Sequence, residues 1–256
     1  MDALLRGKVA VITGGASGNG RAIALAFARH GADVVIADIR QEPREGGVPT
    51  QQLISQQTGA RAKFISCDVT RLADLEAAVA TADDLGGLDI MVNNAGILTK
   101  QSLLEAEEAE FDRMMAVNVK SVYFGSQVAA KRMLVKGKGA IINMSSIAGM
   151  RGTGGYAAYC TSKGAVRHMT YALADELGPK GIRVNALHPG IIETQMNIVD
   201  DPVIGTSEGE SYLPMIPLRR WGQASEVADA AVYLASDLAS YVNGASLVVD
   251  GGFLRI

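Results

Sequence analysis

The stretch AVITGGASGNGRAIALAF, residues 10–27, places four glycines between two apolar runs. The first run is short and β-branched, and the second continues as an alanine-rich helical pattern. A strand followed by a glycine turn and a helix leaves unpaired N–H groups and a partial positive charge at the start of the helix, where an anion can approach the main chain. The stretch therefore predicts a phosphate-binding turn at the start of an α/β fold.

Two phosphate-binding templates do not fit this turn. The spacing of Gly15 and Gly20 matches a P-loop, but Arg21 and Ala22 stand where the lysine and the hydroxyl residue are needed. The dinucleotide pattern GxGxxG fails because Ile23 follows Gly18 and Gly20 where the third glycine belongs. What remains is Thr-Gly-x3-Gly-x-Gly, with Thr13 at its head.

Strand-like runs alternate with helical patterns along the whole chain. The strands are expected at 8–13, 33–38, 62–68, 88–94, 139–146, 182–188 and 245–250, and the helices at 19–30, 49–58, 71–85, 108–136, 157–178 and 224–236. This rhythm predicts a doubly wound α/β fold with a parallel sheet of about seven strands and helices on both faces. No change in composition marks a linker, so residues 1–256 are expected to form a single domain, with a substrate loop at about 191–222.

Composition excludes several classes of protein. The net charge of −3 over 256 residues disfavours nucleic-acid binding. The chain has neither an apolar run long enough for a membrane span nor an export leader, and its two cysteines, Cys67 and Cys160, suit a reducing compartment, so a cytoplasmic location is expected. The three histidines, His30, His168 and His188, have no metal-ligand spacing, so no metal site is expected.

Asp38 ends the second predicted strand, 18 residues after Gly20. A carboxylate at that place can accept both hydroxyls of an adenosine ribose and repels a 2′-phosphate. This favours NAD over NADP, although Arg40, two residues on, leaves NADP as the less favoured alternative.

Tyr159 and Lys163 lie four residues apart in a helical pattern and hence on one face. An ammonium about 4 Å from a phenol lowers the pKa of the phenol by about 3 units at an effective dielectric of about 20. Ser146 ends a predicted strand 13 residues earlier, which places its hydroxyl at the carboxyl edge of the sheet, whereas Ser145 should face the other way and serve structure.

Taken together and in order, these motifs resemble the short-chain dehydrogenase/reductase family along essentially the whole chain. The resemblance also rests on Asn118 in AVNV, on NNAG at 93–96 and on HPGIIET at 188–194. It implies a Rossmann-like fold and an NAD-dependent oxidoreductase acting on CH–OH groups (EC 1.1.1.-), as an alcohol dehydrogenase or carbonyl reductase. The catalytic residues that it implies are Asn118, Ser146, Tyr159 and Lys163.

The resemblance also implies a set of cofactor contacts, a small-molecule alcohol or ketone substrate and a homotetramer. The expected cofactor-binding residues are Gly14, Ser17, Gly18, Asn19, Gly20, Asp38, Asp68, Val69, Asn94, Ala95, Gly96, Tyr159, Lys163, Pro189, Gly190, Ile192 and Thr194. Asn93 is expected to tie strands together instead. Asn19 departs from the family, which usually has an apolar residue there.

Two alternative functions stay open from the sequence. A 3-oxoacyl-[acyl-carrier-protein] reductase shares these catalytic residues but normally prefers NADPH and has a basic residue where this chain has Ser17. A non-catalytic cofactor-sensing protein typically lacks the tyrosine or the lysine, and both are present here. Loop sequences do not define the shape of a pocket, so the sequence does not identify the substrate.

Overall fold

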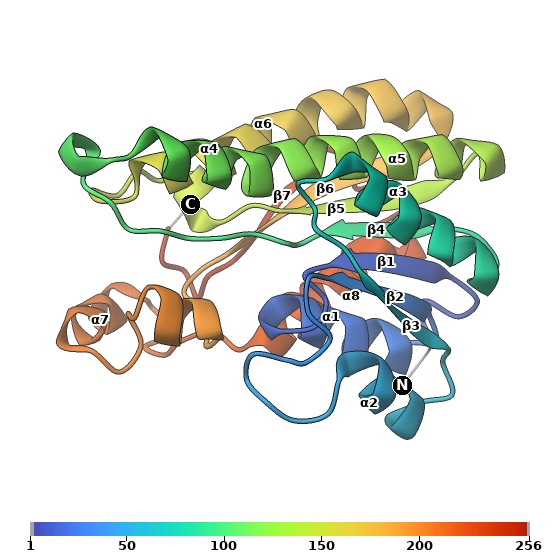
Figure 1. Ribbon diagram of the computed structural model, residues 1–256, viewed down its shortest axis with the longest axis horizontal. Coiled ribbons are helices and arrows are strands. Elements are labelled where there is room, and N and C mark those ends of the chain that lie inside the picture. Colours follow the sequence, from blue (N-terminus) through green and yellow to red (C-terminus); the bar gives the residue numbers. More distant parts are fainter. Residues whose placement is uncertain (1–2, 255–256) are drawn as a thin grey trace.

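A seven-stranded sheet forms the centre of the computed structural model, which describes residues 3–254 (Figure 1). Its strand order is β3-β2-β1-β4-β5-β6-β7, and every neighbouring pair is parallel. The strands are β1 (Val9–Thr13), β2 (Asp33–Asp38), β3 (Ala62–Ser66), β4 (Ile90–Asn93), β5 (Gly139–Met144), β6 (Ile182–Pro189) and β7 (Ser246–Val249). The predicted parallel, doubly wound sheet is confirmed, and each strand falls within the range expected from the sequence except β6, which ends one residue later, at Pro189.

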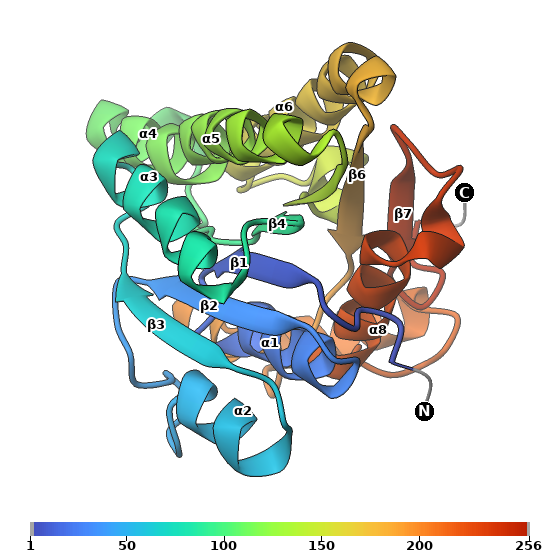
Figure 2. The same cartoon turned by 90° about the vertical axis from the view of Figure 1, so that its right-hand side faces the viewer.

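Helices cover both faces of the sheet. Figure 2 shows α3, α4, α5 and α6 on one side and α1, α2 and α8 on the other. The α-helices are α1 (Gly18–Arg29), α2 (Thr50–Gln57), α3 (Leu72–Thr81), α4 (Glu108–Met115), α5 (Ser121–Lys136), α6 (Ala157–Leu177), α7 (Ser207–Tyr212) and α8 (Ala224–Ala235). The Rossmann-like arrangement follows from this layering.

The near-continuous apolar runs of the strands are explained by two separate cores. Along β1, Ala10 and Ile12 pack into the core on the side of α1 and α8, whereas Val9 and Val11 pack into the core on the side of α3 and α5. Successive side chains of a strand point to opposite faces, so a strand with helices on both faces needs apolar residues at every position.

The strand order reverses direction next to β1. The chain runs from β1 outward to β2 and β3, then returns to place β4 on the other side of β1. In an open α/β sheet this reversal leaves a crevice at the carboxyl ends of the strands, where ligands bind. The glycine turn leaves β1 at that point.

Two predicted segments differ from expectation in their details. The single helix expected at 108–136 is interrupted by a π-helical turn at Ala116–Lys120 that separates α4 from α5. The irregular stretch 191–222 contains a second π-helical turn, Met196–Asp200, followed by α7, which stands apart from the sheet at the left of Figure 1. Within residues 3–254, no helix has the length and hydrophobicity of a membrane span.

Candidate active site

The glycine turn is shaped by close approach of main-chain groups. Gly14 and Gly18 have φ values of +65° and +52°, in the left-handed region that favours glycine. A Cβ at Gly20 would collide with the carbonyl oxygen of Gly14. The turn therefore needs glycine at these places for backbone conformation and space.

The first main-chain N–H of α1 already donates a hydrogen bond to a side-chain carboxylate of the same protein. The main-chain N–H of Gly18 donates to Oε1 of Glu45 over 3.0 Å, and Nε of Arg21 lies 3.9 Å from the same oxygen. The Glu45 carboxylate stands in for the kind of oxyanion that a phosphate presents. The turn thus fits the diphosphate of a dinucleotide, because its donor already binds an anionic oxygen and its glycines leave the main chain uncovered.

Asp38 lies at the end of β2 beside the turn. Its carboxylate accepts N–H bonds from Ala16 over 3.0 Å and from Arg40 over 3.3 Å. Burial raises the pKa of Asp38 above its ordinary value of 3.8, and main-chain N–H groups of Ala16, Arg40 and Ile39 partly offset this rise. An ionised carboxylate has about four acceptor positions, so Asp38 keeps capacity for ribose hydroxyls.

Two asparagines at the end of β4 have different tasks. Asn93 donates through Nδ2 to Ser126 over 3.0 Å and to Asn143 over 2.9 Å, so it ties β4 to its neighbours as predicted. The Nδ2 of Asn94 donates to the carbonyl oxygens of Thr13, over 2.9 Å, and Gly14, over 3.2 Å. Asn94 therefore holds the glycine turn in place through hydrogen bonds to its main chain. The sequence did not reveal this structural role.

Tyr159 and Lys163 both lie buried on α6, at 9% and 5% exposure. The Lys163 ammonium donates to the carbonyl oxygen of Met144 over 2.9 Å and lies 5.7 Å from the centre of the Tyr159 ring. Desolvation by burial lowers the pKa of Lys163 to about 8.

The lowered pKa expected for the Tyr159 phenol is not seen. Burial raises its pKa to about 12, and the hydrogen bond from Ser146 opposes that rise only in part. The expectation was wrong because it counted the attraction of the ammonium and made no allowance for desolvation, which disfavours the phenolate. The phenol is therefore protonated at neutral pH.

Asn118 is fully buried in the π-helical turn between α4 and α5. Its Oδ1 accepts the N–H of Ile97 over 2.9 Å, and its Nδ2 donates to the Ile97 carbonyl over 2.9 Å and to Ser162 over 3.1 Å. Asn118 thus fixes the segment after β4 against α6, one residue from Gly96. π-Turns inside helices are frequent at functional sites.

Both serines after β5 border the cleft, but they differ in burial. Ser145 is buried and donates to the carbonyl oxygen of Lys163 over 2.8 Å, which is the structural role expected of it, whereas Ser146 is only partly buried. His188 on β6 is fully buried, and its Nδ1 lies 2.9 Å from the carbonyl oxygen of Ser146. A carbonyl can only accept, so Nδ1 carries the proton and holds the main chain of Ser146 in place.

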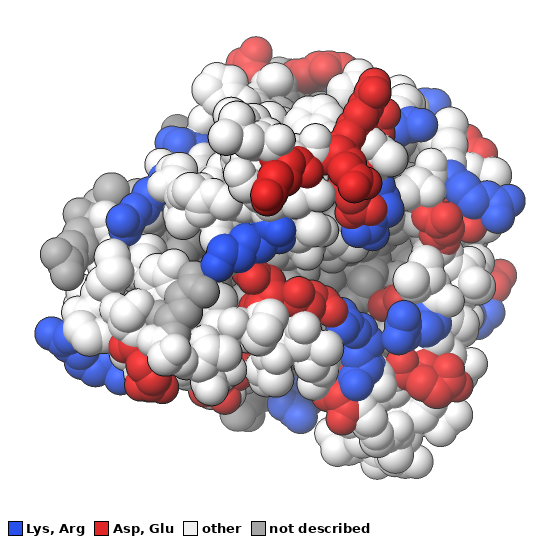
Figure 3. Space-filling view, turned by 60° about the vertical axis from the view of Figure 1, so that its left-hand side comes forward, with Lys and Arg blue, Asp and Glu red and all other residues white. Residues whose placement is uncertain are grey.

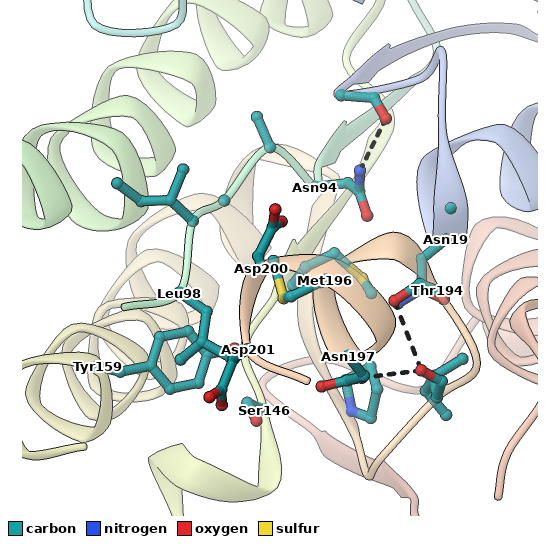
Figure 4. A pocket seen from close by; sticks show the side chains of 18 of the residues that line it. Asn19, Asn94, Leu98, Ser146, Tyr159, Thr194, Met196, Asn197, Asp200 and Asp201 are labelled. Atoms are coloured by element: carbon teal, nitrogen blue, oxygen red, sulfur yellow. Dashed lines mark hydrogen bonds between the residues drawn. The ribbon is translucent and has the colours of Figure 1, made fainter. Parts of the chain in front are cut away.

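One cleft of about 1030 Å³ joins the glycine turn to Tyr159. It is lined by all the expected catalytic and cofactor-binding residues except Gly20, which lies behind the turn, and Asn118, which is buried behind the wall. Figure 4 shows Ser146 and Tyr159 facing the cavity, with Asn19 and Thr194 on its far side. Acidic and basic side chains both surround the hollow in Figure 3, and neither sign dominates that face.

Two polar pairs connect the segment 191–222 to the rest of the cleft. Arg44, from the loop after β2, forms two bonds of 2.6 Å with the carboxylate of Asp200. The hydroxyl of Tyr156 donates to Oδ2 of Asp201 over 2.6 Å. Sequence reasoning missed both pairs, because each joins loops that are far apart in the chain.

Two aromatic residues of the segment 191–222, Tyr212 and Trp221, lie in different surroundings. Tyr212 lines the cleft, whereas Trp221 packs into a small apolar cluster with Val203 and Ile216. Among residues 3–254, no group of histidine, cysteine and acidic side chains is arranged to hold a metal ion.

Comparison with known proteins places this geometry among oxidoreductases. A family model described as Enoyl-(Acyl carrier protein) reductase matches residues 14–254. The chain is 41% identical to cyclopentanol dehydrogenase of Comamonas testosteroni over 249 residues, covering 96% of both chains. It is 40% identical over 254 residues to 3-alpha-(or 20-beta)-hydroxysteroid dehydrogenase of Mycobacterium tuberculosis, covering 98% of this chain and 91% of the relative.

Solved structures agree with these relatives. The crystal structure of a gluconate 5-dehydrogenase from Burkholderia cenocepacia, in complex with NADP and tartrate, superposes with a TM-score of 0.90 at 33% identity. The match covers 99% of this chain and 98% of that one.

Proposed function

Because this chain belongs to the short-chain dehydrogenase/reductase family, and its relatives include dehydrogenases of cyclopentanol and of hydroxysteroids, we propose that it is an NAD-dependent oxidoreductase for a secondary alcohol and its ketone. The observation that carries the proposal is that one cleft holds Ser146, Tyr159 and Lys163 at one end and an oxyanion-binding glycine turn at the other. The cofactor, when bound, supplies or takes up the hydride.

The protein's own groups handle the proton and the substrate oxygen. Tyr159, protonated at neutral pH, donates to the carbonyl oxygen during reduction and takes the proton back during oxidation. Ser146 donates a second hydrogen bond to that oxygen, so negative charge developing there meets two donors. Lys163 would hold the ribose hydroxyls of the cofactor, and Lys163 together with the buried Asn118 would provide the route by which the proton leaves.

The preference for NAD over NADP rests on the surroundings of Asp38. A 2′-phosphate would meet this carboxylate. Of the two arginines that line this part of the cleft, Arg44 is already bound to Asp200, which leaves Arg40, next to Asp38, as the residue that would compensate a 2′-phosphate. The Burkholderia gluconate 5-dehydrogenase contains NADP, so the preference of this chain is tested directly by comparing kcat/KM for the two cofactors.

We also propose that the chain forms the homotetramer that the family resemblance implies. Apolar side chains on the outer side of α4 and α5 support an interface there: Phe111, Tyr123, Leu134 and Val135 are all exposed. Light scattering at micromolar concentration tests this, and a stable monomer would contradict it.

Tyr159→Phe tests the proposed function. Removing the hydroxyl that exchanges the proton should reduce turnover of cyclopentanol with NAD, followed at 340 nm, by about 10²–10⁴-fold while NADH still binds. Tyr171→Phe is the matched control, because Tyr171 lies on the same helix but bonds to Arg167 and Ser246 instead of lining the cleft. Undiminished turnover in Tyr159→Phe would mean that another group moves the proton.

A further inference from the structure

Asp201 places a carboxylate in the substrate end of the cleft. It follows the π-helical turn Met196–Asp200, is only 8% exposed and lines the same cavity as Ser146 and Tyr159. Figure 4 shows its carboxylate pointing into that cavity. The family motifs discussed above do not include this position.

The carboxylate is held firmly through one of its two oxygens. Oδ2 accepts the Tyr156 hydroxyl over 2.6 Å, and the main-chain N–H of Asp201 donates to the Met196 carbonyl over 2.9 Å. Tyr156 directly precedes α6, the helix that carries Tyr159, and both tyrosines line the same cavity as Asp201. The Asp201 carboxylate is therefore fixed to the start of the catalytic helix.

The other oxygen has acceptor capacity left. Within the part of the chain that the structure describes, Oδ1 of Asp201 takes part in no hydrogen bond, whereas both oxygens of the adjacent Asp200 are bound by Arg44. Oδ1 is not among the fully buried oxygens without a partner, so it is accessible from the cleft, and an ionised carboxylate can accept about four hydrogen bonds. A donor from the substrate would complete this set.

We propose that Asp201 selects uncharged, polyhydroxylated substrates, with Oδ1 accepting a hydrogen bond from a second hydroxyl near the carbinol that reacts. The inference rests on the proposed function, whose substrate class it specifies. The same carboxylate repels a substrate carboxylate placed next to it, so sugar acids are disfavoured at this position. Arg151 and Lys163 line the same cavity and offset the negative charge of Asp201, so the donor proposed is a neutral hydroxyl rather than an ammonium.

A ring-matched set of alcohols tests the proposal. In the wild type, kcat/KM for cis-1,2- or cis-1,3-cyclopentanediol should exceed that for cyclopentanol by at least tenfold, as expected for one hydrogen bond to a charged group. Glucitol should likewise be preferred to gluconate. Asp201→Leu should abolish the preference for the diol, and the milder Asp201→Asn should reduce it and improve the use of gluconate.

Two controls distinguish the effect of the Asp201 side chain from the effect of the loop's negative charge and from effects on the catalytic step. Asp200→Asn removes the neighbouring charge and should keep the ratio of diol to monohydric alcohol. Calorimetric binding of the same alcohols to Tyr159→Phe loaded with NAD reads the preference without turnover, so it remains measurable if the assignment of Tyr159 fails. An unchanged ratio in both Asp201 variants, tighter binding of 2-aminocyclopentanol than of the diol, or a wild type that prefers gluconate would overturn the proposal.

Discussion

Replacing Glu45 by alanine should tighten the binding of the dinucleotide. The Glu45 carboxylate occupies the Gly18 N–H at 3.0 Å, and a cofactor phosphate needs the same donor, so binding has to break this bond first. A hydrogen bond to a charged group contributes about 1.5–3 kcal/mol. The Glu45 side chain is 34% exposed, so water weakens the bond, and we take about 1 kcal/mol, or about fivefold in affinity.

The assay is a titration of each variant with NADH, followed by quenching of protein fluorescence. Glu45→Ala should lower the dissociation constant about fivefold, and Glu45→Gln should fall between it and the wild type, because its amide oxygen still accepts but carries no charge. Glu42→Ala, an exposed acidic residue of the same loop, is the matched control for net charge. Weaker binding by Glu45→Ala would refute the competition and would mean that Glu45 supports the bound state.

Three further outcomes follow from the geometry. Asp38→Ala should raise kcat/KM for NADP relative to NAD by about tenfold or more, since it removes a carboxylate from the place of the 2′-phosphate; an unchanged ratio would remove Asp38 from cofactor selection. Burial lowers the pKa of Lys163 from 10.5 to about 8, so between these values the unfolded chain binds more protons and stability rises with pH. Urea unfolding at pH 7 and pH 10 should show the wild type gaining about 2 kcal/mol more than Lys163→Met, and equal gains would contradict a buried ammonium. Gly20→Ala should lower stability by about 1–3 kcal/mol through its collision with Gly14, whereas Gly59→Ala, which meets open space, should cost little; calorimetric melting temperatures compare the two.

The sheet and the arrangement of the cleft could be predicted from the sequence because each has a local signal. A strand between two layers of helices must be apolar at nearly every position, and β1 and β2 show this in a few residues. The glycine turn is visible because only glycine tolerates its conformation and crowding. The carboxyl ends of parallel strands then bring Ser146 and Asp38 to the same edge.

Contacts between loops carry no such signal. Glu45 meets Gly18 across 27 positions, and Arg44 meets Asp200 across 156, with no periodicity linking the partners. The π-helical turn at Asn118 was equally hidden, since α4 and α5 read as one continuous helical pattern. The pKa of Tyr159 was misjudged for a related reason: spacing along a helix reveals a neighbouring charge but not how completely folding removes water.

The ion pair between Arg44 and Asp200 joins two loops on opposite sides of the cleft. Arg44 lies on the loop after β2, beside the part of the cleft that suits an adenosine. Asp200 ends the π-helical turn that directly precedes Asp201. The pair therefore ties the loop beside Asp38 directly to the segment that ends at the substrate side of the cleft. While both bonds are intact, the two loops are held at one fixed separation.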